Sequence, residues 1–319
     1  MWKYPLNLIA VTHKHRLMKI VFMGTPDFAV ASFAALVDAG FEVVGVVTAA
    51  DKPAGRGQKL QESAVKQYAV SKGITVLQPL KLKDPVFIDD LKNLGADLQV
   101  VVAFRMLPEV VWNMPSKGTI NLHASLLPQY RGAAPINHAI INGEKESGVT
   151  TFFLKHEIDT GDIIFFEKVA IADDETAGEL HDKLMNVGAG LLVKTVTAIA
   201  AGDYQEQPQP ESDELKHAPK IFKDDCFIDW KQPVQAVFNR IRGLSPYPTA
   251  FTKLNDKTLK IFMAEPEDKE PGIAAGGFLT DGKSFLKFAT KDGFIKLLDV
   301  QYEGKKRMGV EEFLRGVRL

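Results

Sequence analysis

Two polar side chains end an apolar segment that has the composition of a β-strand. Residues 118–123 read GTINLH, with Asn121 and His123 two positions apart. Side chains at such spacing share one face of a strand, and open α/β sheets hold their ligands at the carboxyl ends of strands. An amide and an imidazole can together donate hydrogen bonds to one developing oxyanion. The pair is therefore a candidate catalytic group, and a hydrogen-bonded structural pair is the alternative.

A carboxylate on a turn between two apolar strands is a candidate third member of this group. Residues 157–162 read EIDTGD and follow a strand that begins with Gly148-Val149-Thr150. On such a turn Asp159 could orient a histidine and accept a proton. Taken alone, Asp159 would be interpreted as an aspartate that stabilises a turn and has no catalytic role.

The sequence contains neither a complete dinucleotide-binding motif nor a convincing set of metal ligands. The turn Gly24-Thr25-Pro26 has one glycine where a dinucleotide fingerprint has three, and we expect Thr25 or Asp27 to cap the helix that follows. No pair of histidines has zinc spacing together with a third ligand, so we predict no metal. The single cysteine, Cys226, can form no intrachain disulfide, which fits a reducing compartment.

Alternating strands and helices must position these groups. Expected strands are 19–23, 42–47, 74–77, 97–103, 118–123, 148–154 and 162–171, and expected helices are 27–39, 62–72, 85–94, 134–142 and 176–201. Strands rich in Val and Ile between helices indicate a parallel sheet covered on both faces. No apolar run approaches the ~20 residues that span a bilayer, so we expect no membrane contact.

The composition changes after residue 201. Residues 202–220 are rich in Pro, Gln and charge, and predict a linker. One helix near 232–242 and short strands at 249–254, 258–263, 285–289 and 294–300 then indicate a small all-β barrel. We therefore expect an N-terminal extension over 1–17, disordered and unlike a secretory signal, a catalytic domain over 18–203, a linker over 204–220 and a β-barrel domain over 221–319.

Charge is unevenly distributed although the net charge is −1. That balance argues against a protein that binds nucleic acid over its whole surface. Basic residues nevertheless outnumber acidic ones by seven to one over residues 52–83 and by nine to four over 216–260, with an acidic zone between. The two basic zones predict a local site for a polyanion, and solvated charged faces are the alternative.

The motifs together resemble the folate-dependent formyltransferase superfamily. The resemblance rests on Asn-x-His followed by Ser-Leu-Leu-Pro and Tyr-Arg-Gly, and on a Gly-Val-Thr strand leading to Ile-Asp-Thr-Gly. Within the superfamily the chain is most similar to the methionyl-tRNA formyltransferases, because GTPDF at 24–28, PAGRG at 53–57 and GKKRM at 304–308 also match. The resemblance implies an α/β fold: a Rossmann-like formyltransferase domain with a mostly parallel sheet, followed by a small OB-like β-barrel.

Carried over residue by residue, the resemblance implies three groups of site residues. The catalytic group is Asn121, His123 and Asp159. The folate-binding group is Ser125, Leu126, Leu127, Pro128, Phe104, Met106 and Ile158, although residues 104–108 (FRMLP) depart from the family's aromatic-Gly-apolar pattern. The tRNA-binding group is Lys52, Arg56 and Lys59, on a loop that composition alone would describe as solvated.

The implied reaction transfers a formyl group from 10-formyltetrahydrofolate, a cosubstrate, to the α-amino group of initiator methionyl-tRNA, with no metal. The expected partners are this tRNA and the folate donor, and the expected state is a cytoplasmic monomer. The alternatives are a formyltransferase acting on a sugar amine or glycinamide ribonucleotide, a formyl-folate hydrolase, and a folate- or RNA-binding module without activity. The barrel after residue 220 and the basic loop disfavour the other enzymes, and the intact catalytic group disfavours the inactive module.

Overall fold

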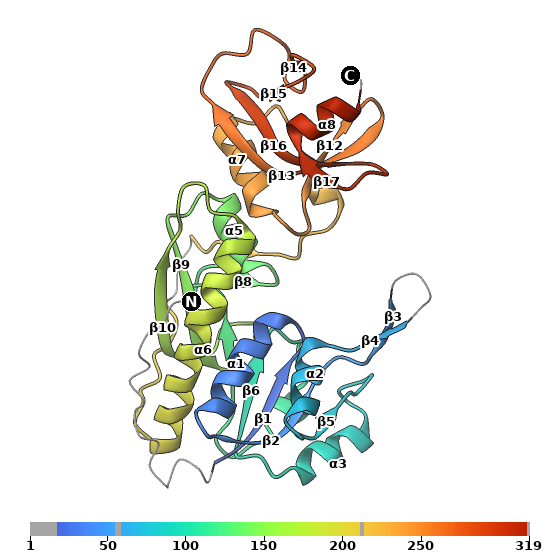
Figure 1. Cartoon of the computed structure of the whole chain (residues 1–319). Coiled ribbons are helices and arrows are strands. Elements are labelled where there is room, and N and C mark those ends of the chain that lie inside the picture. The colour runs from blue at the N-terminus through green and yellow to red at the C-terminus, as the bar shows by residue number, and fades with distance from the viewer. Residues whose placement is uncertain (1–17, 55–58, 211–213, 318–319) are drawn as a thin grey trace. The chain divides into compact units, whose positions relative to one another are not determined.

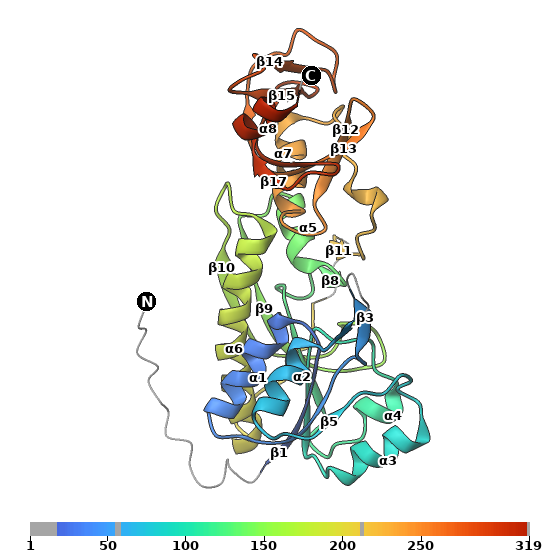
Figure 2. The same cartoon turned by 45° about the vertical axis from the view of Figure 1, so that its right-hand side comes forward.

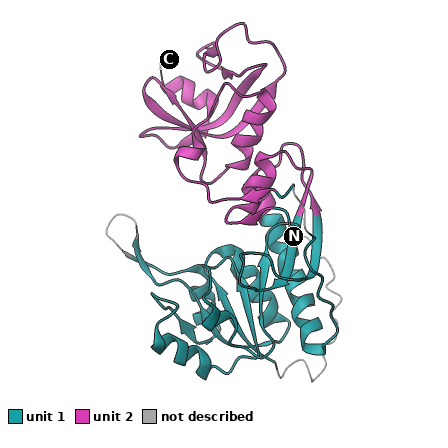
Figure 3. Cartoon of the chain, turned by 180° about the vertical axis from the view of Figure 1, so that it is seen from behind, with its two compact units in different colours: residues 1–129, 148–168, 182–215 teal, residues 130–147, 169–181, 216–319 magenta. Residues whose placement is uncertain are grey.

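The computed structural model describes residues 18–54, 59–210 and 214–317, so the predicted extension over 1–17 and Arg56 lie outside the described residues. The chain divides into two compact units (Figure 3). Unit 1 takes its residues from 1–129, 148–168 and 182–215, and unit 2 takes its residues from 130–147, 169–181 and 216–319.

A seven-stranded, mostly parallel sheet forms the centre of unit 1 (Figure 1). Its order is β10-β9-β7-β6-β1-β2-β5, in which β7 pairs in parallel with β6 and antiparallel with β9. The strands are β1 (Lys19–Gly24), β2 (Glu42–Val47), β5 (Val76–Leu77), β6 (Leu98–Val102), β7 (Thr119–His123), β9 (Glu146–Phe153) and β10 (Ile163–Ala170). The predicted parallel sheet is confirmed, and β9 is its antiparallel neighbour.

Helices cover both faces of this sheet. They are α1 (Asp27–Asp38), α2 (Ala64–Ser71), α3 (Pro85–Asn93), α4 (Glu109–Trp112) and α6 (Ala177–Ala201). Because side chains alternate along β1, Val21 and Met23 join the core under α3 and α4, whereas Phe22 stacks on Phe33 of α1 with ring centroids 5.0 Å apart. This two-sided burial explains why the strands read as continuous apolar runs.

The turn after β1 depends on close packing. A Cβ atom at Gly24 would lie 2.6 Å from the Cβ of Ala29 and 2.9 Å from the carbonyl oxygen of Val102. The N-cap residue of α1 is Pro26, which makes no side-chain capping hydrogen bond. The structure thus has Pro26 at the N-cap position and neither Thr25 nor Asp27, and the fixed φ angle of proline suits the start of a helix.

Helix α6 is long and apolar enough to pass a length-and-hydropathy test for a membrane span. The same pattern is typical of a core helix, and α6 lies along β9 in both Figure 1 and Figure 2. Leu184, Leu192 and Val196 are buried, and a Cβ at Gly188 would lie 2.9 Å from Leu122 of β7. These contacts explain the apolar composition of α6 by packing on the sheet.

Unit 2 contains an antiparallel sheet of order β12-β13-β16-β15-β14, with β17 paired to β16. Its strands and helices are β8 (Arg131–Gly132), α5 (Pro135–Ile141), β11 (His217–Ala218), a 3-10 turn at Asp224–Cys226, α7 (Val234–Gly243), β12 (Ala250–Leu254), β13 (Lys257–Glu267), β14 (Phe278–Thr280), β15 (Leu286–Ala289), β16 (Phe294–Tyr302), β17 (Arg307–Gly309) and α8 (Val310–Gly316). The curled sheet is consistent with the small barrel predicted for this region.

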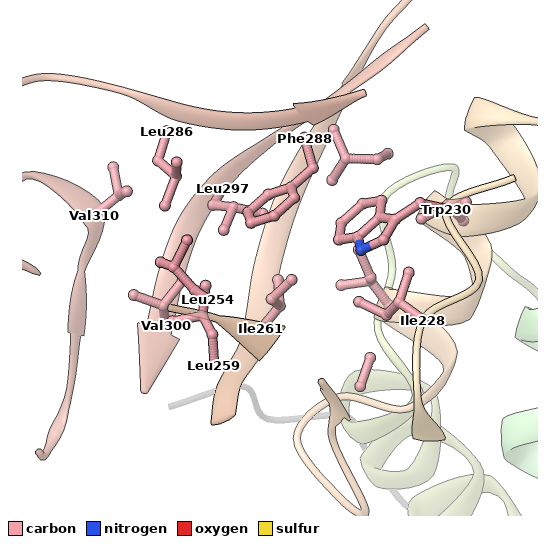
Figure 4. Close-up of a cluster of buried hydrophobic side chains, with 14 of the residues drawn as sticks. Ile228, Trp230, Leu254, Leu259, Ile261, Leu286, Phe288, Leu297, Val300 and Val310 are labelled. Carbon is pink, nitrogen blue, oxygen red and sulfur yellow. The ribbon is translucent and has the colours of Figure 1, made fainter. Parts of the chain in front are cut away.

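The core of unit 2 is built around Trp230 (Figure 4). Its ring stacks on Phe288 with centroids 4.7 Å apart, and its indole N–H donates to the hydroxyl of Thr252 at 2.9 Å. A buried indole needs such a partner. Residues from earlier in the chain also belong to this unit: the amide of Asn137 in α5 donates to the carbonyl of Gly243 in α7 at 2.8 Å.

We predict opposite effects of alanine at two glycines of unit 1. Gly24→Ala should lower the free energy of unfolding by about 1–3 kcal/mol, because the new methyl group overpacks the junction of β1, β6 and α1. Gly190→Ala, in the exposed middle of α6 where nothing lies within 4 Å of a new Cβ, should raise it by about 0.5–1 kcal/mol. Urea unfolding of both variants measures this, and equal effects would contradict the packing described for Gly24.

Candidate active site

The site is built at the carboxyl end of β7. In the ladders Asn121 pairs with Val101 of β6 and with Phe152 of β9, and His123 pairs with Thr150 of β9. Asn121 is partly exposed, whereas His123 has 6% of its surface exposed. The pairing on both sides fixes the two side chains on one face of a central strand.

The turn between β9 and β10 carries Asp159, whose backbone has a φ angle of 55°. Non-glycine residues adopt this left-handed conformation rarely, at a cost of about 1–2 kcal/mol. The turn is also pressed onto β9, because a Cβ at Gly161 would lie 1.6 Å from the carbonyl oxygen of Phe153. Glycine at 161 is therefore required for Asp159 to be where it is.

These two constraints bring Asp159 toward the end of β7. Its Oδ2 lies 3.9 Å from Nδ1 of His123, and both side chains are largely buried. That distance is longer than a direct hydrogen bond, and catalytic hydrogen bonds commonly shorten only when substrate binds. The structure thus brings together the imidazole and the carboxylate that the sequence suggests as partners.

The segment after β7 is held in place by one hydroxyl group. Thr150 donates its hydroxyl to the carbonyl of Ser125 at 2.7 Å and accepts a hydrogen bond from the amide of Leu127 at 3.2 Å. The Ser125 hydroxyl in turn donates to the carbonyl of Gln129 at 2.7 Å. Ser125 and Leu127 are buried, and Leu126 and Pro128 are partly exposed. The predicted folate stretch is therefore a fixed loop beside His123.

A second loop leaves the end of β6 and runs into α4. Phe104 packs partly buried in the core under this loop, whereas 75% of Met106 is exposed. Met106 lines an open pocket of about 670 Å³ together with residues 82–83, 105 and 107–110. Ile158, on the Asp159 turn, is 61% exposed. Exposed apolar side chains on these two loops are candidates for contact with the ring system of a ligand.

The predicted basic loop begins and ends as a hairpin of β3 (Lys52–Ala54) and β4 (Lys59–Gln61). Lys52 is exposed and pairs with Gln61, and Lys59 pairs with Ala54. Arg56 belongs to residues 55–58, which are not described. The hairpin is anchored by Asp51, whose carboxylate forms an ion pair with Lys66 and accepts from the amide of Gln78 at 2.7 Å. These bonds hold the pKa of Asp51 below its usual value.

Two residues at the site were missed from the sequence. Thr150 was noted only as part of a strand, although its two hydrogen bonds fix the folate stretch. The side-chain amide of Gln209 donates to the carbonyls of Asp159 and Gly161, both at 2.8 Å, and lies in the segment predicted as a linker. Across the described ranges there is no group of three or more His, Cys, Asp or Glu side chains that could hold a metal ion.

The fold is that of an α/β domain with a polar group at the carboxyl end of a central strand, where sheets of this kind bind their ligands. Residues 18–196 match the family described as formyl transferase, and residues 220–318 match the formyl transferase C-terminal domain. The chain belongs to the formyl transferase family and is a formyl-transferring enzyme.

Close relatives carry a more specific name. The chain is 56% identical over 310 residues to the methionyl-tRNA formyltransferase of Bacteroides fragilis, covering 95% of this chain and 96% of that one. It is also 56% identical over 311 residues to the methionyl-tRNA formyltransferase of Parabacteroides distasonis, covering 94% and 96%. The similarity therefore extends over nearly the whole length of this chain and of both relatives.

Solved structures share the fold at low sequence identity. HypX from Aquifex aeolicus, in complex with tetrahydrofolic acid, has a TM-score of 0.65 and 19% identity, covering 94% of this chain and 48% of that one. The N-formyltransferase from Helicobacter canadensis, in complex with folinic acid and dTDP-3-aminofucose, has a TM-score of 0.64 and 21% identity, covering 92% and 100%. At these identities the likeness supports the architecture alone.

The Thr150 clamp gives a testable prediction. Thr150→Val keeps the shape of the side chain and removes both hydrogen bonds, so a buried carbonyl and a buried amide lose their partner. We expect the free energy of unfolding to fall by about 1–3 kcal/mol, and the Leu127 amide to exchange its hydrogen faster. Thr197→Val is the control, because the Thr197 hydroxyl bonds only to the carbonyl of Val193 within α6. If the two variants had equal free energies of unfolding and equal exchange rates at the Leu127 amide, Thr150 would not stabilise the loop that follows β7.

Proposed function

We propose that this enzyme transfers a formyl group from 10-formyltetrahydrofolate to the α-amino group of methionyl-tRNA. The observation that carries the proposal is the convergence of Asn121, His123 and Asp159 at the end of β7, with the Asp159 carboxylate 3.9 Å from the imidazole. The acceptor is proposed from the name of relatives that are 56% identical over nearly the whole chain. A cytoplasmic location follows from the same assignment.

The proposed chemistry is acyl transfer. The neutral amine of the acceptor forms a bond to the formyl carbon, and the carbonyl oxygen becomes an oxyanion. Asn121 and His123 donate hydrogen bonds to that oxyanion, which lowers the barrier because the donors are already oriented before the charge develops. Asp159 holds His123 in its useful orientation and helps to remove the proton from the attacking nitrogen. The bond to the folate nitrogen then breaks, and that nitrogen takes up a proton.

Two loops are proposed to hold the folate donor. Residues 125–128 are fixed by Thr150, and a fixed loop can present its backbone groups to a ligand without loss of conformational freedom on binding. Phe104, Met106 and Ile158 would contact the ring system from the loop after β6 and from the turn after β9. The two solved relatives are complexes with tetrahydrofolic acid and with folinic acid, which agrees with a folate donor.

The tRNA is proposed to contact the β3–β4 hairpin through Lys52, Arg56 and Lys59. Basic side chains on a hairpin can bind phosphates without reading bases. The C-terminal region beyond residue 220 carries the second basic zone, and we propose it as a further phosphate-binding surface. Together these local contacts would allow a protein with a net charge of −1 to bind a polyanion.

A formyl-transfer assay tests the choice of acceptor. The enzyme is supplied with 10-formyltetrahydrofolate and, in separate reactions, with initiator methionyl-tRNA, a free amino sugar or glycinamide ribonucleotide. We expect product only with the tRNA. Turnover of a small amine at a comparable kcat/KM would replace the proposed acceptor, and release of formate without any acceptor would favour a hydrolase.

We predict that Asn121→Ala and His123→Ala each lower kcat by about 10²–10³, because each removes one donor to the oxyanion. The KM for charged tRNA should change little, since neither side chain is proposed to bind the tRNA body. Steady-state kinetics with both substrates measures this. A double variant with nearly normal kcat would remove these residues from the mechanism.

We also predict that Arg56→Ala weakens tRNA binding at low salt and reduces the dependence of log Kd on log salt concentration by about one. The reason is that one phosphate contact fewer releases fewer counterions. Folate binding should be unaffected. Lys92→Ala, in α3 and outside both basic zones, is the control. The same steep slope in Arg56→Ala and the wild type would place the tRNA elsewhere.

A further inference from the structure

A segment that follows α6 lies against the turn that carries Asp159. Gln207 and Ile163 exchange two backbone hydrogen bonds of 2.8 and 2.9 Å, and the ring of Tyr204 lies 5.8 Å from that of Phe153 in β9. All four residues belong to unit 1. The segment is therefore bound to the end of the sheet, next to the candidate catalytic group.

Gln209 makes the contact that reaches this group. Its Nε2 atom donates to the carbonyl of Asp159 and to the carbonyl of Gly161, each at 2.8 Å. A side-chain amide nitrogen has two hydrogens, and the two carbonyl groups can each accept a hydrogen bond from one of them. Because both partners are acceptors, only the NH₂ group of the glutamine fits between them.

The residue held in this way is under strain. Asp159 has a φ angle of 55°, and a strained backbone persists only where its surroundings enforce it. On one side the close approach of Gly161 to Phe153 fixes the turn, and on the other side Gln209 holds the two carbonyls. Between these contacts the Asp159 side chain is directed to within 3.9 Å of His123.

We propose that Gln209 is a positioning residue for catalysis, which acts by holding the Asp159 turn in the conformation that presents its carboxylate to His123. The inference rests on the proposed role of Asp159. A side chain that only stabilised the fold would lower activity and stability together, whereas a positioning residue should lower kcat through Asp159 and lose its effect when Asp159 is already inactive.

The test compares variants of the full-length enzyme. Gln209→Glu keeps the shape and sets a carboxylate oxygen against two carbonyls, and Gln209→Met removes the donors without adding charge. Gln207→Glu is the matched control, because Gln207 lies two residues away, is exposed and joins the sheet through its backbone. Each Gln209 substitution is also made in an Asp159→Asn background, and single-turnover formyl transfer is measured with whichever acceptor the wild type formylates.

We expect Gln209→Glu and Gln209→Met to lower the transfer rate at saturating substrates about tenfold or more, since small displacements at a reacting centre cost up to about 10² in rate. The KM for the acceptor and the rate of Gln207→Glu should stay within about twofold of wild type. In the Asp159→Asn background the Gln209 substitutions should change the rate less than about twofold.

Equal losses in both backgrounds, or wild-type rates in both Gln209 variants, would overturn the proposal. If Gln209→Glu does not fold, Gln209→Met decides the outcome. If the wild type formylates a small amine instead of tRNA, the proposed acceptor is wrong, but the Gln209 variants can still be compared with that amine. Failure of the proposed acceptor and failure of the proposed role of Gln209 are therefore distinguishable.

Discussion

The position of Asp159 depends on one backbone contact, between Gly161 and the carbonyl group of Phe153 in β9. Any side chain at 161 would push the turn away from the strand, and Asp159 with it. Because β9 runs antiparallel to β7, its last residue, Phe153, pairs with Ile120 near the start of β7, and the turn leaves β9 there. From that point the turn carries the Asp159 carboxylate to within 3.9 Å of the His123 imidazole at the other end of β7.

Side-chain hydrogen bonds fix two further segments of the candidate site. Thr150, opposite His123 in the ladder, uses both hydrogen-bonding capacities of its hydroxyl to hold the loop that follows β7. Gln209 uses both hydrogens of its amide to hold the turn that follows β9. Fixed donors and acceptors of this kind let a site stabilise charge without reorganising during the reaction.

Much of this architecture could be predicted because it depends on local pattern. Valine-rich strands between helices predicted the parallel sheet, and the strand 42–47 was predicted with the bounds that β2 has. The hairpin β3–β4 was not predicted, because Gly and Pro in residues 53–57 are typical of an irregular loop. The short elements β14, β17 and α8 were also missed, since a few residues carry no clear periodicity.

The contacts that orient the site could not be predicted from local pattern. Gln209 lies 50 residues after Asp159, in a stretch whose composition resembles a linker, so its partner is visible only in three dimensions. The left-handed conformation of Asp159 is also not encoded by its residue type, which adopts such angles only occasionally. By contrast, the shared face of Asn121 and His123 was predicted from their spacing, because the period of a strand fixes which side chains share a face, whereas their proposed catalytic role came from the family resemblance.

The coupling between His123 and Asp159 is the measurement that tests this account most directly. Single-turnover formyl transfer is compared among the wild type, His123→Ala, Asp159→Asn and the double variant. If Asp159 acts through His123, the double variant should be no slower than His123→Ala within about twofold, because residues that act as a unit are not additive. Losses that multiply in the double variant would show that the two side chains act separately, and would contradict the proposal that Asp159 acts through His123.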